Sequence, residues 1–240
     1  MEVYERGPVK LVLADCWEWL PTLEAGSVDA VVTDPPYGVG LGRTEGAGSG
    51  HGLVREAYRG FDDTYDHFLN VIVPRINLSL DCARRGAVFS GPHIHEQRKP
   101  DAIGGVYCSA AAGRHKWGFK NFLPVLLYGT AAGLQNGARY PSAINSNATS
   151  EPSGHPCPKP IEWMEWLVNL ASLEDETVCD PFTGSGTTAI ACIRTGRRFI
   201  GCEISSQYWE IACARIDREL DQGRLAFDAP ATTATQKTLL

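Results

Sequence analysis

The chain has 240 residues, of which 43% are hydrophobic and 21% are charged, and its formal net charge is −6. The length allows one large domain with a substantial core, and the composition is that of an ordinary globular protein. The acidic balance argues against a general nucleic-acid coat protein, although it is compatible with a local basic face.

The first part of the chain predicts strands that alternate with helices. Apolar residues over 9–14 indicate a strand, and the apolar spacing over 17–23 indicates a short helix. A second strand begins at Val28 and ends at Asp34-Pro35-Pro36-Tyr37, because a proline cannot donate to a strand ladder. This order predicts a parallel sheet, in which ligands bind at the carboxyl ends of the strands.

The later elements continue this alternation. The pattern predicts a helix over 66–84, a strand over 86–90, a weakly helical stretch near Glu96, and an edge pair or hairpin over 119–128 that Pro124 interrupts. It then predicts a helix over 161–171, a strand over 176–180, a helix over 187–195, a strand over 198–203 and a helix over 206–220. We therefore expect one domain over residues 1–221.

Three segments lack such periodicity. The glycine-rich segment 38–60 follows Asp-Pro-Pro-Tyr directly and predicts a mobile loop, which is either a lid or a plain surface insertion. Segment 129–154 predicts a loop that is long enough to suggest a function. The Ala/Thr-rich residues 222–240 predict a disordered tail.

Other classes of protein are disfavoured. No segment is as long and apolar as a membrane span, and the amino-terminal residues lack the pattern of a signal peptide. The eight cysteines form no C-x-x-C pair, so we expect no metal site. Reduced core thiols indicate a cytoplasmic protein.

A glycine turn follows the strand over 176–180. Asp180-Pro181-Phe182-Thr183-Gly184-Ser185-Gly186-Thr187-Thr188 predicts a strand end, a turn that a ligand can approach closely, and a helix start with free N–H groups. No lysine follows the glycines, so this is not a Walker A loop. Glu203 ends the next strand about 20 residues later, where an acid that binds ribose hydroxyls is expected. Together these features predict a ligand that contains adenosine.

These motifs resemble a known family, the amino-group DNA methyltransferases of the β arrangement, over most of residues 9–220. Asp-Pro-Pro-Tyr precedes the glycine turn, as it does in that family. Ala14-Asp15-Cys16 is similar to its Gly-Asp-Cys, 155–160 (His-Pro-Cys-Pro-Lys-Pro) to its His-Pro-x-x-Lys-Pro, and 200–203 to its Ile-Gly-x-Glu. The resemblance implies an α/β, Rossmann-like methyltransferase fold with a mostly parallel, doubly wound sheet and a circularly permuted motif order.

The resemblance also implies S-adenosylmethionine as the cofactor. Asp180, Phe182, Gly184 and Gly186 would hold its methionine and sulfonium end, Glu203 its ribose, and Asp15 its adenine amino group, while Lys159 and Pro160 would form the opposite wall. The expected cofactor site comprises Asp15, Lys159, Pro160, Asp180, Pro181, Phe182, Gly184, Ser185, Gly186, Thr187 and Glu203.

The expected catalytic residues are Asp34, Pro35, Pro36 and Tyr37. The exocyclic amine of a base is a poor nucleophile, because its lone pair is conjugated into the ring. The Asp34 carboxylate and the Pro35 carbonyl can accept its two N–H bonds and direct the lone pair toward the methyl group, so that positioning and electrostatics supply the catalysis. Tyr37 offers a ring on which a flipped base can stack.

Double-stranded DNA is the implied partner, and no membrane is involved. Basic residues outnumber acidic ones eight to three over 75–120, which is typical either of a phosphate-contacting surface or of a solvated face. The expected DNA contacts are Arg43, Arg84, Arg85, Arg98, Lys99, Arg114, Lys116 and Arg139. Segment 129–154 would recognise the target sequence, and its shortness leaves open whether a homodimer or another chain contributes.

Several alternatives stay open. Aspartate rather than serine at the first motif position favours adenine N6 over cytosine N4. Methylation of an amino group in RNA or on a protein, and an inactive adenosine-binding module, are the other readings of the same motifs.

Overall fold

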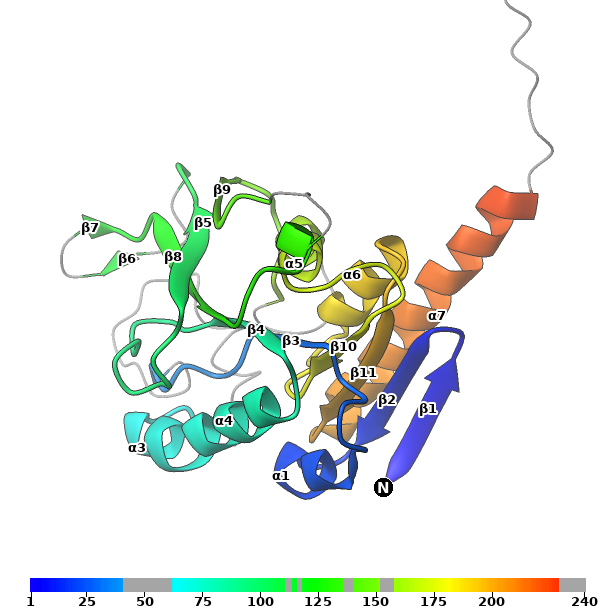
Figure 1. Ribbon diagram of the computed structural model, residues 1–240, viewed down its shortest axis with the longest axis horizontal. Helices are drawn as coiled ribbons and strands as arrows, with labels where there is room; N and C mark the ends of the chain where they lie inside the picture. Colours follow the sequence, from blue (N-terminus) through cyan, green and yellow to red (C-terminus); the bar gives the residue numbers. More distant parts are fainter. Residues whose placement is uncertain (41–61, 111–113, 116–117, 136–139, 152–157, 229–240) are drawn as a thin grey trace, which may run out of the picture.

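The computed structural model describes residues 1–40, 62–110, 114–115, 118–135, 140–151 and 158–228. Within these residues, nine strands form one sheet in the order β1-β2-β11-β10-β3-β4-β8-β5-β9 (Figure 1). Their bounds are β1 Glu2–Arg6, β2 Val9–Leu13, β3 Ala30–Thr33, β4 Arg85–Phe89, β5 Ala102–Tyr107, β8 Phe122–Tyr128, β9 Ala143–Asn145, β10 Thr177–Asp180 and β11 Arg198–Glu203. A separate pair joins β6, Arg114–His115, to β7, Gly118–Phe119.

The centre of the sheet is parallel. β2, β11, β10, β3 and β4 run in the same direction, whereas β1 and β8 pair with this group antiparallel. β10 lies directly beside β3, with Val178 opposite Ala30, although these residues are far apart in the sequence. This confirms the expected mostly parallel sheet with a permuted motif order.

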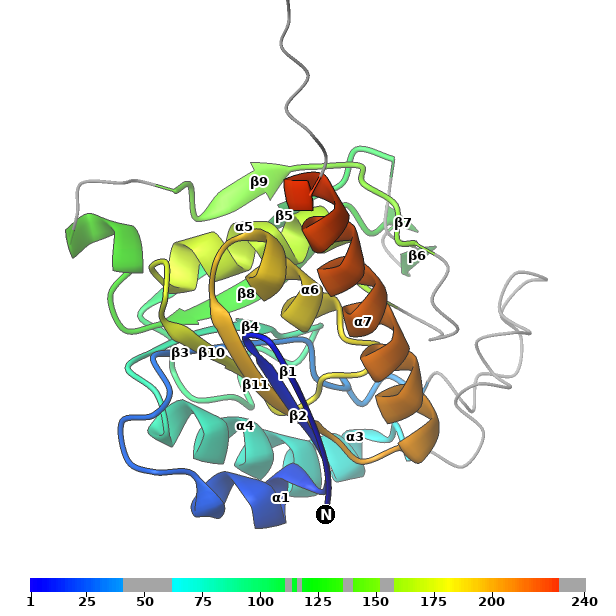
Figure 2. The same cartoon turned by 90° about the vertical axis from the view of Figure 1, so that its right-hand side faces the viewer.

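Helices cover both faces of the sheet. They are α1 Cys16–Trp19, α3 Tyr65–His67, α4 Val73–Asp81, α5 Ile161–Ala171, α6 Thr187–Arg194 and α7 Ser206–Asp228. α5, α6 and α7 lie on one face, and α1, α3 and α4 lie on the other (Figure 2). Alternate strand residues supply two cores: Ala30 and Val32 face the core of α5, whereas Val31 faces that of α1 and α4.

The sheet has a switch point between β10 and β3. From β10 the chain crosses through α6 to β11 on one side, and from β3 it crosses through α4 to β4 on the other. The carboxyl ends of β10 and β3, which carry Asp180 and Asp34, therefore meet where an open α/β sheet binds its ligand.

Most predicted elements are present with small changes in their bounds. The helix expected over 66–84 is α3, a π-helical turn at Phe68–Ile72 and α4, in direct succession. The π turn lies just before Pro74, whose missing N–H and bulky ring disturb regular α-helical bonding. Of the cysteines in the described residues, Cys16, Cys108, Cys179, Cys192 and Cys202 are free and buried, as expected for core thiols.

Several sequence expectations are wrong. No helix forms near Glu96, β1 was not foreseen, and segment 129–154 contains a 3-10 turn at Ala132–Gln135 as well as β9. α7 continues to Asp228, beyond the expected boundary at 221, and the rest of the expected tail lies outside the described residues. Most of the expected loop 38–60 also lies outside them.

β8 is an internal strand and not an edge. It pairs with β4 on one side and β5 on the other, and Pro124 lies within it. The Pro124 carbonyl accepts a hydrogen bond from the Ser90 N–H, so its nitrogen also faces the β4 side, just beyond the end of β4. The missing donor therefore costs little in this position.

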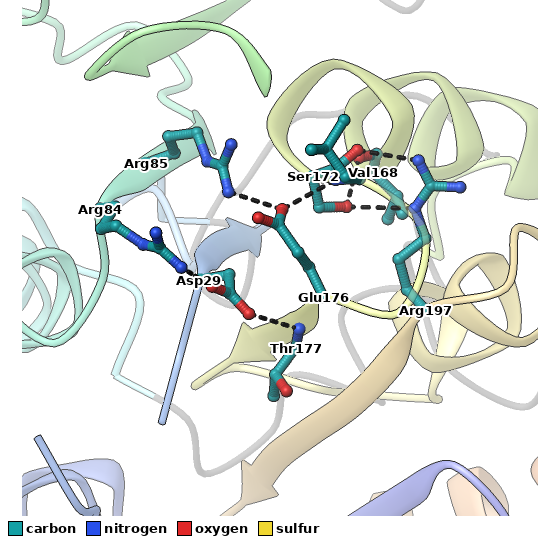
Figure 3. A network of polar contacts seen from close by, with 9 residues as sticks. Asp29, Arg84, Arg85, Val168, Ser172, Glu176, Thr177 and Arg197 are labelled. Atoms are coloured by element: carbon teal, nitrogen blue, oxygen red, sulfur yellow. Dashed lines mark hydrogen bonds and ion pairs between the residues drawn. The ribbon is translucent and has the colours of Figure 1, made fainter. Parts of the chain in front are cut away.

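A polar network lies at the amino ends of the central strands (Figure 3). Arg85 is buried and donates to Glu176 at 2.5 Å, while Arg84 pairs with Asp29, which also accepts from the Thr177 N–H. Arg85 begins β4, so this edge is opposite the carboxyl end that carries Asp34. Arg85 therefore supports the fold, whereas the Arg84 side chain is largely exposed, and the expected DNA contacts of both residues stay predictions.

Among the described residues, no helix combines the length and the apolar character that a membrane crossing requires.

Replacing Arg85 with methionine is expected to lower the free energy of unfolding by about 3 kcal/mol, because it leaves Glu176 without its cation in a largely buried setting. Urea denaturation measures this change. Lys99→Met removes an exposed lysine and is the control, with an expected change below about 0.5 kcal/mol. A loss no larger than that of the control would show that the Arg85 pair does not support the fold.

Candidate active site

Asp34 follows β3 directly, and its carboxylate is held by two donors. The Tyr37 hydroxyl donates to Oδ1, and the Lys159 Nζ lies 2.6 Å from Oδ2. The side chains of Lys159 and Asp34 are 12% and 23% exposed, so this ion pair is shielded from water. Lys159 therefore lies at the carboxylate of Asp34, the expected catalytic residue, whereas the sequence placed it on the wall of the cofactor site.

Two aromatic rings complete the surroundings of this pair. The Lys159 ammonium lies 5.3 Å from the centre of the Tyr37 ring and 5.2 Å from that of Phe89. The Tyr37 ring packs on the backbone of Gly91, whose φ is +58°, and a methyl group added there would come within 2.6 Å of the ring. Gly91 thus provides both the turn and the space that Tyr37 occupies.

Lys120 is a second cation near Asp34. It precedes β8, which runs antiparallel to β4, so it lies beyond the carboxyl end of that strand. Burial lowers the pKa of the half-buried Lys120, and the charge of Lys159 lowers it further, whereas Asp34 acts in the opposite direction. Lys159 and Lys120 thus surround the Asp34 carboxylate with positive charge.

Asp180 connects β3 to the glycine turn. It is 2% exposed, and its Oδ1 accepts from the Thr33 hydroxyl at 2.6 Å and from the Phe182 N–H at 3.0 Å. Its Oδ2 accepts from the Thr188 hydroxyl at 2.5 Å. Burial raises the pKa of Asp180 to about 6, although these donors lower it. The geometry favours a supporting role for Asp180 over direct contact with a ligand.

Glu203 holds the other side of the turn. Its Oε2 accepts from the Gly184 N–H at 2.8 Å and its Oε1 from the Ser205 N–H at 2.9 Å. Burial raises the pKa of this carboxyl group, and the backbone donors lower it. Gly184 and Gly186 have φ of +53° and +82°, which explains the two glycines. This carboxylate, beside a turn that a ligand can approach, suits a ribose.

Asp15 lies at the same edge, beyond β2. The Ala14 N–H donates to the Glu203 carbonyl at 3.0 Å, so the two acids are on neighbouring strands. Arg75 engages both Asp15 oxygens, with Nε–Oδ1 of 3.0 Å and Nη2–Oδ2 of 2.7 Å, and this pairing lowers the pKa of Asp15. Asp15 also caps α1 through the Trp17 N–H. An adenine amino group would have to share this carboxylate with Arg75.

Only some of the expected DNA-contacting residues lie in the part of the chain that the structure describes. Arg98 donates to Asp81 at 2.7 Å, and its carbonyl accepts from the Tyr128 hydroxyl, which places it near the amino end of β4 and away from Asp34. A run of charges in sequence does not show which edge of the sheet each residue reaches, and the expected DNA contact of Arg98 stays a prediction. Lys99 is exposed. Arg114 has its backbone in β6, and Arg43, Lys116 and Arg139 lie outside the described residues.

The sequence did not identify several residues that build this site. Thr188 had a signal, because it follows the glycine turn directly, whereas Thr33 looks like any buried strand residue. Arg75, Lys120 and Gly91 reach the site from elements with no motif of their own.

A family model described as DNA methylase, covering the N6 and N4 enzymes, matches residues 95–214, which is half of the chain. The chain therefore belongs to this DNA methylase family. Among its relatives, the type II methyltransferase M1.MboII of Moraxella bovis is 24% identical over 83% of this chain and 93% of its own length. M.HindIII of Haemophilus influenzae is 38% identical over 36% of this chain.

These alignments differ in extent. The matched part of this chain spans about a quarter of the length of the curated relatives with higher identity, for example 28% of M.HindIII. A crystal structure of M1.HpyAVI in complex with S-adenosylmethionine covers 87% of this chain and 99% of its own, with a TM-score of 0.61 and 19% identity. At that identity the likeness establishes the fold alone, as a methyltransferase fold.

The pKa of Asp180, raised from 3.8 to about 6, predicts a dependence of stability on pH. Between these values the folded protein retains a proton that the unfolded chain releases, so the free energy of unfolding should fall as pH rises, by up to about 3 kcal/mol. Carbon-13 NMR titration of the Asp180 carboxyl group, assigned with Asp180→Asn, measures the pKa. A midpoint at or below 3.8 would contradict the effect of burial.

Proposed function

We propose that this protein is an S-adenosylmethionine-dependent DNA methyltransferase that acts on the exocyclic amine of a flipped base, and that the base is adenine, methylated at N6. The observation that carries the proposal is the link between Asp34 and the glycine turn. Thr33 immediately precedes Asp34 and donates to Asp180, which in turn accepts from Thr188 on α6. Asp34, which can accept from an amine, and the glycine turn, which can bind a nucleoside, are thus parts of one rigid unit.

The residues present suit the cofactor. Glu203 offers a carboxylate for ribose hydroxyls, and Gly184 and Gly186 leave the turn without side chains that would block a ligand. When bound, S-adenosylmethionine would supply an electrophilic methyl group.

The chain's own residues orient the amine. Each Asp34 oxygen accepts from one donor, Tyr37 or Lys159, and has a second lone pair that can accept the amine N–H. Its second N–H is accepted by the Pro35 carbonyl, which the rigid Pro35-Pro36 pair holds in place. With both N–H bonds engaged, the lone pair points away from the two acceptors, toward the methyl donor.

The proton that the amine loses after transfer has an acceptor at Asp34, whose carboxylate remains beside the nitrogen. Tyr37, fixed against Gly91, is the ring on which the flipped base stacks. The family spans both N6 and N4 enzymes. Asp34 at the first motif position supports adenine, and cytosine N4 is the second candidate because the same acceptors fit either amine.

The proposal predicts that the purified protein transfers labelled methyl groups to unmethylated double-stranded DNA, and that nuclease digestion yields N6-methyladenine. Asp34→Ala should lower the rate by about 100-fold or more while affinity for S-adenosylhomocysteine changes by less than about threefold, because the acceptor of the amine is lost. Mass spectrometry of nucleosides and calorimetry measure the two effects.

The products separate the alternatives. N4-methylcytosine would replace the adenine assignment. Label only in RNA or protein would reject DNA as the substrate. Cofactor binding without transfer to any polymer would indicate an adenosine-binding module.

Gly91→Ala tests the position of Tyr37. The new methyl group would overlap the ring, so we expect methyl transfer to fall at least about tenfold. Gly26→Ala is the matched control, because Gly26 has φ of +77° and an added methyl group there meets nothing within 4 Å. Both variants carry a backbone penalty of about 1–2 kcal/mol, but only Gly91→Ala should lose activity. Equal activity in the two variants would contradict the role of Gly91.

A further inference from the structure

A buried arginine lies beneath the glycine turn. Arg215, in the middle of α7, is 9% exposed. Its Nη1 donates to the Ser185 carbonyl at 2.6 Å, to the Ser185 hydroxyl at 3.0 Å and to the Thr187 hydroxyl at 3.3 Å. One guanidinium nitrogen thus reaches both residues that flank Gly186.

The charge of Arg215 is poorly compensated. Its carboxylate partner is Glu151, which lies 3.9 Å from Nη2 and has a side chain that is 64% exposed. Arg215 also contacts the first turn of α6, where the helix dipole is positive. Burial lowers the pKa of Arg215, yet a guanidinium remains charged in proteins. A buried cation with weak compensation lowers stability. The contribution of Arg215 is therefore its hydrogen bonds, which order the glycine turn.

The turn is therefore fixed at both ends. Glu203 holds the Gly184 N–H at 2.8 Å, and Arg215 holds Ser185 and Thr187. Between them, Gly186 packs so closely on α7 that an added methyl group would lie 3.2 Å from the Ala212 Cβ. Because both hydroxyls accept from Arg215, their own protons remain for other acceptors.

We propose that Arg215 is a positioning residue that fixes the Ser185–Thr187 end of the turn for the amino-acid end of S-adenosylmethionine. The inference rests on the proposed function. The ribose is assigned to Glu203, and the methyl group must face Asp34, so the amino-acid end lies along the turn on the side away from Glu203. A guanidinium charge beneath that end favours the cofactor carboxylate, and the ordered turn lowers the entropy cost of binding it.

The experiment compares two ligands that differ in this end. S-adenosylhomocysteine carries the amino acid, whereas 5′-methylthioadenosine lacks it. We expect Arg215→Met to weaken S-adenosylhomocysteine binding at least about tenfold, and to change methylthioadenosine binding by less than about threefold. Isothermal titration calorimetry of the full chain measures both affinities, and thermal melting records whether each variant is folded.

Two matched variants isolate the role of the buried guanidinium. Arg218→Met removes an exposed arginine three residues along the same helix and should leave both affinities unchanged. Glu151→Gln removes the distant, exposed partner and should also have little effect, because exposed ion pairs contribute little. If Arg215→Met does not fold, Arg215→Lys serves instead. It keeps the charge but loses the planar fork, and should weaken S-adenosylhomocysteine binding by a smaller factor.

Equal losses for the two ligands would overturn the inference, because they would show a general effect on the turn. Unchanged S-adenosylhomocysteine affinity in a folded Arg215→Met or Arg215→Lys protein would overturn it as well. If the unmodified protein bound neither ligand, the proposed function would fail and the inference with it. If the unmodified protein bound both ligands but the Arg215 variants lacked the expected selective loss of affinity, only the role of Arg215 would be rejected.

Discussion

The site depends on the hydrogen bonds that the buried Asp180 carboxylate accepts. Asp180 ends β10, yet it accepts from a hydroxyl on β3 and from another on α6. Ion–dipole hydrogen bonds of this kind are strong where water is excluded, and here they hold β3, which leads to Asp34, against the helix that follows the glycine turn. The raised pKa of the carboxyl group reflects the cost of placing it there, and the donors around it offset part of that cost.

Charge around this centre is arranged by edge. At the carboxyl edge, Lys159 and Lys120 flank Asp34, and Arg75 forms an ion pair with Asp15. Acids and cations therefore alternate beside the expected ligand. At the amino edge, Arg84 and Arg85 are bound to acids next to the strand starts, Asp29 and Glu176. The fold therefore separates cations that shape the site from cations that support the sheet.

The sequence was sufficient where a residue's role depends on its neighbours along the chain. Asp34 with its two prolines, the glycine turn and Glu203 were predicted from local pattern, because strand ends and turns are set by the residues that form them. The same reasoning did not reveal the ion pairs of Arg85 and Arg98, whose partners come from other segments. It also failed for β8, where Pro124 is tolerated because a neighbouring strand ends beside it. Thr33 and Arg215 could not be recognised, since only the packed structure shows which buried polar groups they reach.

The position of β10 and β11 in the sheet has a consequence for how the chain acquires its structure during synthesis. Both strands lie between β2 and β3, although they come from the last third of the sequence. The ribosome releases the chain from its amino end, so β2 and β3 emerge long before their partners β11 and β10. Until then, each has an unpaired edge. The nascent protein must keep these apolar edges from pairing with other chains until residue 203 has emerged.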